Sequence, residues 1–336
     1  MTKTAIPNPT TFGDWAYLAI EKHYQKTLKH EADVLDDKDP EALHQMRVGM
    51  RRLRTAVTGF AYAIALPKAA QEKKIGKVAR RLGELRDLDV LQDTLQNDYL
   101  PKLPPKEQDT LKKVLTALDK QRRKSLEHVQ ATLKGRSYHK LKQAFDDWLE
   151  KPTYGKLSSI SIYEVLPEVL LPSLSDLFLQ PAWLVGANLE VKDGNTSNTL
   201  DSDTVVQLLH ESGDLLHTLR KQGKQVRYQM ELFTGFYGDE YKSYVKDIKC
   251  IQSILGHIQD SFVLAEFLRD TLGSEITEQV PTLFSLLTDA RYQSWQEWQA
   301  LQQRYLNPQT KINLYQTVLK PMAPISSDQS DSMQEI

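Results

Sequence analysis

The sequence contains two similar segments at a constant separation, and this internal repeat limits the folds that the chain can adopt. Residues 43–60 read LHQMRVGMRRLRTAVTGF, and residues 216–233, 173 positions later, read LHTLRKQGKQVRYQMELF. The register continues without a gap into a second segment, where Leu82-Gly83 aligns with Leu255-Gly256 and Asp87 with Asp260. A match of this length predicts two copies of one structural unit, each about half of the 336-residue chain.

The spacing of apolar residues predicts helices almost throughout, so we expect an all-α fold. Asp39, Pro40 and Glu41 form a helix-start signal, because an aspartate caps free N–H groups and proline suits the first helical position. Ser212 takes the place of Asp39 in the second copy and is a second candidate N-cap. The predicted helices span residues 12–29, 40–66, 68–97, 105–134, 137–150 and much of 204–320, with short helices between the prolines of 152–186.

Polar segments predict how the chain is divided. We expect the linker between the halves where the sequence is rich in Asn, Asp, Ser and Thr, and a disordered tail after the last helical pattern. The five predicted segments are a flexible N-terminus (1–11), an N-terminal helical half (12–186), a polar linker (187–203), a C-terminal helical half (204–320) and a disordered tail (321–336).

A basic stripe lies beside the apolar face of the repeated helix in both copies. Apolar residues recur at spacings of three and four, as expected of a bundle helix, and basic residues repeat the same spacing one position later. One position is about 100° of helix rotation, so the basic residues flank the buried seam. These positions are His44, Arg47, Arg51 and Arg54 in the first copy and His217, Arg220, Lys224 and Arg227 in the second.

The net charge conceals this local concentration of basic residues. The chain has 43 Lys and Arg residues against 44 Asp and Glu, a net charge of -1, which taken alone argues against binding to a polyanion. Yet residues 44–86 hold eleven basic residues against two acidic ones, a net of +9. Residues 120–142 hold eight against one, a net of +7. The acidic residues that balance these regions lie elsewhere in the sequence.

A basic helical stripe can be a solvated surface or a binding site for an anion. Like charges three or four positions apart repel, at a cost of a few tenths of a kcal/mol for each pair. Here no acidic residues are interleaved, and the stripe occurs in both copies with a histidine at its start. We therefore favour an anionic partner that contacts both stripes.

The sequence offers little for catalysis. It contains no P-loop, no G-x-G-x-x-G, H-E-x-x-H or G-x-S-x-G pattern and no paired-carboxylate motif, so we expect neither an enzyme nor a cofactor. Cys250 is the only cysteine, which excludes an intrachain disulfide and CxxC zinc sites. His44 and His217 have cationic helical neighbours, which oppose a metal ion.

Two other interpretations concern single residues. The segment that starts at His217 loosely resembles the phosphorylated helix of histidine phosphotransfer domains, which remains an alternative for the function. Asp87 and Asp260 could be catalytic acids or partners of arginines, and we favour buried partners that hold part of the stripe in place.

Four sequence blocks together resemble the conserved histidine α-helical domain (CHAD) family. In the first half they are residues 43–54 (LHQMRVGMRRLR) and 81–90 (RLGELRDLDV). In the second half they are residues 216–221 (LHTLRK), followed by Lys224 and Arg227, and Leu255-Gly256 with Asp260. The resemblance covers roughly residues 12–305.

Membership in this family would imply two four-helix-bundle-like repeats related by a pseudo-twofold axis, with a basic groove or cavity that binds inorganic polyphosphate. The implied ligand contacts are His44, Arg47, Arg51, Arg54, His217, Arg220, Lys224 and Arg227, with Arg52, Lys77, Arg80 and Arg81 as contributors.

Two departures of the second copy from the first concern these positions. Gln225 stands where the first copy has Arg52, and Ser253 and Ile254 stand where it has Arg80 and Arg81. We therefore expect weaker binding by the second copy. Some relatives carry a triphosphate-tunnel domain with alternating glutamates, and because the sequence has no such segment we expect no hydrolysis.

The predicted function is therefore non-catalytic binding of inorganic polyphosphate, with association with polyphosphate granules. The alternative is a nucleic-acid-binding helical protein that uses the same stripes. No apolar run reaches the length of a membrane span, and the N-terminus lacks the pattern of a secretory signal, so we expect a cytoplasmic protein that has no membrane partner.

Overall fold

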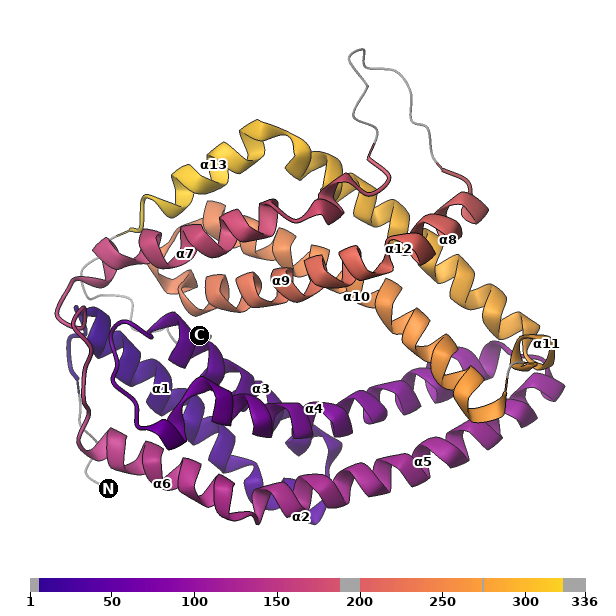
Figure 1. Ribbon diagram of the computed structural model, residues 1–336, viewed down its shortest axis with the longest axis horizontal. Helices are drawn as coiled ribbons and strands as arrows, with labels where there is room; N and C mark the ends of the chain where they lie inside the picture. Colours follow the sequence, from indigo (N-terminus) through magenta and orange to yellow (C-terminus); the bar gives the residue numbers. More distant parts are fainter. Residues whose placement is uncertain (1–5, 188–199, 274, 323–336) are drawn as a thin grey trace. The chain divides into compact units, whose positions relative to one another are not determined.

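The computed structural model describes residues 6–187, 200–273 and 275–322, and these residues are almost entirely helical (Figure 1). No β-strand occurs among them, and two isolated bridges join Thr11 to Ser161 and Ile64 to Tyr154. The all-α prediction is therefore confirmed. The α-helices are α1 (Phe12–Lys29), α2 (Glu31–Asp36), α3 (Pro40–Gly59), α4 (Glu72–Asp93), α5 (Pro105–Leu133), α6 (Arg136–Glu150), α7 (Ile162–Phe178), α8 (Ser202–Glu211), α9 (Gly213–Leu232), α10 (Asp239–Leu272), α11 (Ile276–Gln279), α12 (Pro281–Leu306) and α13 (Pro308–Val318). Short 3-10 turns are η1 (Lys68–Ala70), η3 (Leu100–Lys102), η4 (Pro181–Leu184) and η5 (Thr234–Phe236), and η2 (Thr94–Tyr99) is a π-helical turn.

The chain forms two compact units. Unit 1 comprises Met1–Lys102 and Leu111–Val165, and unit 2 comprises Leu103–Thr110 and Leu166–Ile336. The division after Val165 lies inside α7, ahead of the predicted linker at 187–203, of which residues 188–199 are outside the described part of the chain. Residues 1–5 and 323–336 of the predicted flexible ends are outside it as well.

Helix α7 corrects the prediction of short helices separated by prolines in 152–186. It is one helix of 17 residues with Pro167 and Pro172 inside it. Each internal proline costs roughly 3 kcal/mol because it removes a hydrogen bond and crowds the preceding turn. The opposing gain is burial, since Leu166, Leu170 and Leu174 are fully buried along one face.

Helix α3 is shorter than predicted, ending at Gly59 and not at Leu66. The following residues form backbone hydrogen bonds with a distant segment: Ala65 N–H donates to Thr153 O at 3.0 Å, and Gly155 N–H donates to Ala63 O at 2.8 Å. These long-range bonds satisfy groups that a longer helix would have used. The start of the helix is as predicted, because the Asp39 side chain accepts from Glu41 N–H at 2.8 Å, whereas Ser212 precedes α9 without a side-chain cap.

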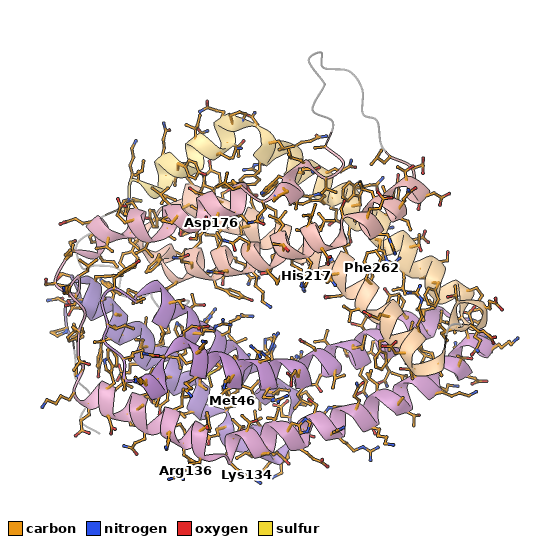
Figure 2. The ribbon with its side chains drawn as sticks, viewed as in Figure 1. Met46, Lys134, Arg136, Asp176, His217 and Phe262 are labelled. Carbon is orange, nitrogen blue, oxygen red and sulfur yellow. The ribbon has the colours of Figure 1, made fainter. Side chains whose placement is uncertain are left out.

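The repeated helix packs through its apolar stripe in each unit. In unit 1, α3 contacts α1 and α4, and in unit 2, α9 contacts α10. Met46 of α3, labelled in Figure 2, is fully buried, as is Leu219 of α9. The apolar stripe therefore forms the seam, and the basic stripe one position later lies at its edge.

A partly buried ion triad in unit 1 joins the turn before α3 to α4 and α5. Arg122 of α5 donates two bonds to Asp37, at 2.8 and 2.9 Å, and one to Asp89 of α4 at 2.7 Å. Asp37 adopts a left-handed conformation, with φ of 49°, that ends α2. Burial raises the pKa of Asp89, against the opposing effect of the Arg122 guanidinium.

A carboxylate in unit 2 explains why the beginning of α5 belongs with that unit. Glu107 is buried and accepts from the N–H groups of Thr282 and Leu283, each at 3.2 Å. These N–H groups lie in the first turn of α12, where they lack intrahelical partners. Glu107 therefore caps α12 from a distant part of the sequence.

Candidate functional site

Arg47 occupies the centre of the basic stripe on α3. Its Nη2 lies 3.5 Å from Oδ1 of Asp87 on α4. A Cβ atom added at Gly83 would lie 3.6 Å from Arg47 Nε, so the guanidinium group rests against the backbone of α4 at this glycine. The glycine therefore lets an arginine lie across the helix seam while keeping 24% of its side chain exposed.

The second unit has the same arrangement at the aligned positions. Nη2 of Arg220 on α9 lies 3.3 Å from Oδ1 of Asp260 on α10, and a Cβ at Gly256 would lie 3.3 Å from Arg220 Nε. Arg220 is also 24% exposed. The interpretation of both aspartates as arginine partners is confirmed.

The aspartates are not buried, which corrects one part of that interpretation. Asp87 is 73% exposed and Asp260 is 66% exposed. Ion pairs between exposed groups contribute about 0–1 kcal/mol, because water screens them. A multiply charged anion could therefore displace either carboxylate at little cost.

The two stripes differ at their C-terminal ends. Arg54 of α3 forms an ion pair with Glu72 of α4 and lies over Gly76. Arg227 of α9 donates to Glu231 of its own helix at 2.7 Å and to Gln252 of α10 at 2.8 Å. Arg227 is therefore held more firmly than Arg54. Arg51 and Lys224, at the aligned positions between these arginines, are half-buried.

The histidines lie at the N-terminal ends of the stripes, and Figure 2 labels His217 on α9. Burial lowers the pKa of His44 below its ordinary value of 6.5; Arg86, Arg47 and Arg51 also lower it, and Glu41 opposes them. Burial likewise lowers the pKa of His217, together with Lys221 and Arg220, against Asp214 and a hydrogen bond with Gln259. Both rings are therefore mainly neutral at pH 7.

Arg52 lies on a different side of α3 from the stripe. It is five positions from Arg47, which is about 140° around a helix. Burial lowers the pKa values of Lys22 and Lys26 on α1, and the charge of Arg52 lowers them further, so Arg52 belongs to a separate basic cluster. The repeat could not reveal these two lysines because the aligned segments contain no part of α1. In the sequence, these two lysines could have been noticed because they lie four positions apart on a predicted helix.

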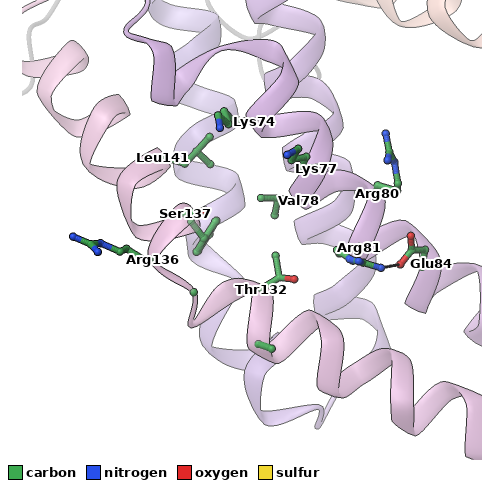
Figure 3. Close-up of a pocket in the computed structure, with 13 residues that line it drawn as sticks. Lys74, Lys77, Val78, Arg80, Arg81, Glu84, Thr132, Arg136, Ser137 and Leu141 are labelled. Carbon is green, nitrogen blue, oxygen red and sulfur yellow. Dashed lines mark hydrogen bonds and ion pairs between the residues drawn. The ribbon is translucent and has the colours of Figure 1, made fainter.

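Lys77, Arg80 and Arg81 are exposed on α4. Arg81 forms an ion pair with Glu84 at 2.7 Å, drawn as a dashed line in Figure 3. At the aligned positions in α10, Ser253 is exposed and Ile254 is buried. Helix α10 therefore presents fewer cations at these positions than α4 does.

Arg86 of α4 was not among the predicted contacts, although the sequence showed it among the basic residues of that helix. The charge of Arg86 lowers the pKa of His44, so this part of α4 lies near the N-terminal end of the α3 stripe.

Across the described ranges, no three His, Cys, Asp or Glu side chains are grouped so that they could hold a metal ion. No helix in these ranges has both the length and the apolar character needed to cross a membrane.

Comparisons with known proteins identify the fold. The chain is 21% identical to the CHAD domain from the plant Ricinus communis, whose crystal structure matches with a TM-score of 0.57 over 96% of this chain and 97% of that chain. PptA from Streptomyces chartreusis is 13% identical and matches with a TM-score of 0.61 over 88% of this chain and 100% of that chain. No curated protein matches the sequence. The CHAD domain family matches residues 18–269, three quarters of the sequence, so the chain belongs to the CHAD domain family.

Proposed function

We propose that the chain binds inorganic polyphosphate without catalysis, through the basic stripes on α3–α4 and α9–α10. The observation that carries this proposal is the arginine of each stripe, Arg47 or Arg220, which is 24% exposed and pairs with an exposed aspartate at 3.5 or 3.3 Å. The resemblance of the surrounding residues to the CHAD motifs supports polyphosphate as the anion.

The mechanism is exchange of one anionic partner for another. Phosphate oxygens replace the carboxylates of Asp87 and Asp260 at the guanidinium groups, whose paired N–H donors match two oxygens of one phosphate. Each phosphate that is neutralised releases counterions from the polyanion, which favours binding at low salt. His44 and His217 add donors at the ends of the stripes.

Binding is the whole of the proposed activity, and no metal or cofactor takes part in it. The protein should leave the length distribution of polyphosphate unchanged and release no orthophosphate during prolonged incubation. Association with polyphosphate granules would follow directly from such binding, with the protein in the cytoplasm.

A titration with polyphosphates of increasing length tests the proposal. We expect affinity to rise with chain length, because more phosphates reach the stripes, and to fall by at least about 100-fold between roughly 50 and 200 mM salt. Single-stranded RNA at equal phosphate concentration should not displace long-chain polyphosphate. Displacement by RNA would instead assign the stripes to nucleic acid, and acid-labile phosphate on His44 or His217 would favour phosphotransfer.

Affinity should also increase as the pH falls below 6.5. The pKa values of His44 and His217 are lowered in the free protein, and a bound polyanion stabilises the imidazolium form. Binding therefore takes up protons, and linkage requires tighter binding at lower pH. Titrations at about pH 7.5 and about pH 5.5 measure the difference.

The double variant His44→Asn, His217→Asn should lose most of this pH dependence while keeping the affinity measured at the higher pH. Equal pH dependence in the variant would show that other groups carry it.

A further inference from the structure

A cavity of about 590 Å³ lies within unit 1, between α4 and the connection from α5 to α6. It does not include the α3 stripe: its lining comes from residues 74–84 of α4, from the end of α5 and from the start of α6. The volume is that of a site for one small molecule, since ligand pockets usually measure about 300–1,000 Å³.

The side chains around the cavity are of two chemical kinds (Figure 3). Val78 reaches into the space from α4, and Leu141 reaches into it from α6, which gives the cavity apolar walls. Lys74 and Lys77 line the α4 side, with Arg81 below them. A ligand that filled this space would therefore contact both apolar surface and cations.

Not every lining cation is directed at the cavity. The guanidinium groups of Arg80 and Arg136 point away from it in Figure 3. Arg81 shares its charge with Glu84, the only carboxylate in the lining. Lys74, Lys77 and Arg81 against Glu84 leave an excess of two positive charges, which suits a ligand with more than one phosphate.

The start of α6 adds donors to the same cavity. Gly135 is the N-cap of this 15-residue helix and supplies no side-chain hydrogen bond to its first turn. Gly135 and Ser137 both line the cavity. The free N–H groups of a helix start favour an anion, and here they supplement the lysines.

We propose that this cavity binds a nucleoside di- or triphosphate. The phosphates contact Lys74 and Lys77, and the organic part packs against Val78 and Leu141. An inorganic polyphosphate chain would gain nothing from the apolar walls, because all of its surface is ionic. The cavity shares Lys77 and Arg81 with the cations of α4 described above, and its apolar walls distinguish it from a site built of charged groups alone.

Calorimetric titration with ATP tests the assignment, in a protein that carries Arg47→Glu and Arg220→Glu so that the stripes do not contribute. We expect one ATP to bind, and inorganic tripolyphosphate to bind at least tenfold more weakly. Equal affinities for the two would overturn the assignment, because the apolar walls would then contribute nothing.

Two variants locate the bound nucleotide. Ser137→Trp fills the cavity without changing its charge, and Lys74→Gln removes one cation; each should weaken ATP binding at least tenfold. Lys140→Gln, an exposed lysine of α6 outside the lining, is the matched control and should leave it unchanged. ATP binding that persists in both cavity variants would refute the proposal.

The proposal for the cavity and the proposal for the stripes can be refuted independently of each other. In the chain with intact stripes, Ser137→Trp should bind long-chain polyphosphate as tightly as the unmodified protein. Loss of polyphosphate binding in that variant would show that the cavity is part of the polyphosphate site and would contradict a separate nucleotide site.

Discussion

The double variant Arg47→Glu, Arg220→Glu is expected to bind long-chain polyphosphate at least about 100-fold more weakly than the unmodified protein. A hydrogen bond to a charged group contributes roughly 1.5–3 kcal/mol, and a loss of about 1.4 kcal/mol at each of two sites lowers affinity tenfold twice. Each glutamate also adds a negative charge beside Asp87 or Asp260, so the variant repels the ligand that the arginine attracted.

Helicity should be unchanged in this variant. Both arginines lie at the surface edge of their helices, and glutamate is a good helix former. The measurements are a polyphosphate titration and a far-ultraviolet circular dichroism spectrum. The control is Lys140→Glu, Lys320→Glu, which makes the same change in net charge at exposed positions outside both stripes. Normal binding by the arginine variant, or equal loss in the control, would remove the stripes from the binding site.

The two single variants should reduce the affinity for polyphosphate by different amounts. Arg47→Glu should reduce affinity more than Arg220→Glu, because unit 1 has Arg80 and Arg81 on α4 where unit 2 has Ser253 and Ile254. The same titration compares them. A larger loss from Arg220→Glu would show that the number of neighbouring cations does not decide the contribution of each unit.

Arg122→Met is expected to lower the free energy of unfolding by about 3–5 kcal/mol. Arg122 is the shared partner of Asp37 and Asp89, and the Asp89 side chain is only 7% exposed. Removal of the guanidinium takes this partner from both carboxylates and leaves the buried Asp89 with only a longer ion pair, to Arg86 at 3.9 Å. The raised pKa of Asp89 shows that burial already disfavours its charged form while Arg122 is present.

Urea unfolding followed by circular dichroism measures the change. Arg123→Met is the matched control, because Arg123 is the next residue of α5 and its ion pair with Asp119, one turn away, is exposed. Its effect should be below about 0.5 kcal/mol. Combining Arg122→Met with Asp37→Asn and Asp89→Asn should restore part of the stability, since the uncompensated charges are then absent. Equal effects of Arg122→Met and Arg123→Met would show that the triad does not stabilise unit 1.

The triad also matters for the stripe. Asp37 lies just before α3 begins, and Asp89 is two positions beyond Asp87 on α4. Arg122 therefore ties α4 to the turn that leads into the stripe helix.

The arginine, glycine and aspartate of each stripe could be read from the sequence, because all three recur at the same offset. Arg47, Gly83 and Asp87 repeat as Arg220, Gly256 and Asp260, and the structure brings each set together. The all-α fold was predictable for a related reason: helix periodicity is a local property that each segment carries by itself.

Features that depend on packing between distant segments could not be read in this way. Propensity alone predicts breaks at Pro167 and Pro172, but the buried leucines of α7 hold the helix together. The proximity of Arg52 to Lys22 and Lys26 depends on the packing of α1, which the repeat does not include. The cavity beside α4 exists because the connection from α5 to α6 returns to that helix, about 55 positions later in the sequence.

The sequence by itself thus determined the helical class, the two copies and the identity of the stripe cations, since each follows from spacing along the chain. Only the tertiary structure decided which cations share a surface, how exposed the paired aspartates are, and where an anion with an apolar part could fit. Those properties depend on which helices pack together, because burial and electrostatic interaction act between residues that are close in space whatever their separation in sequence.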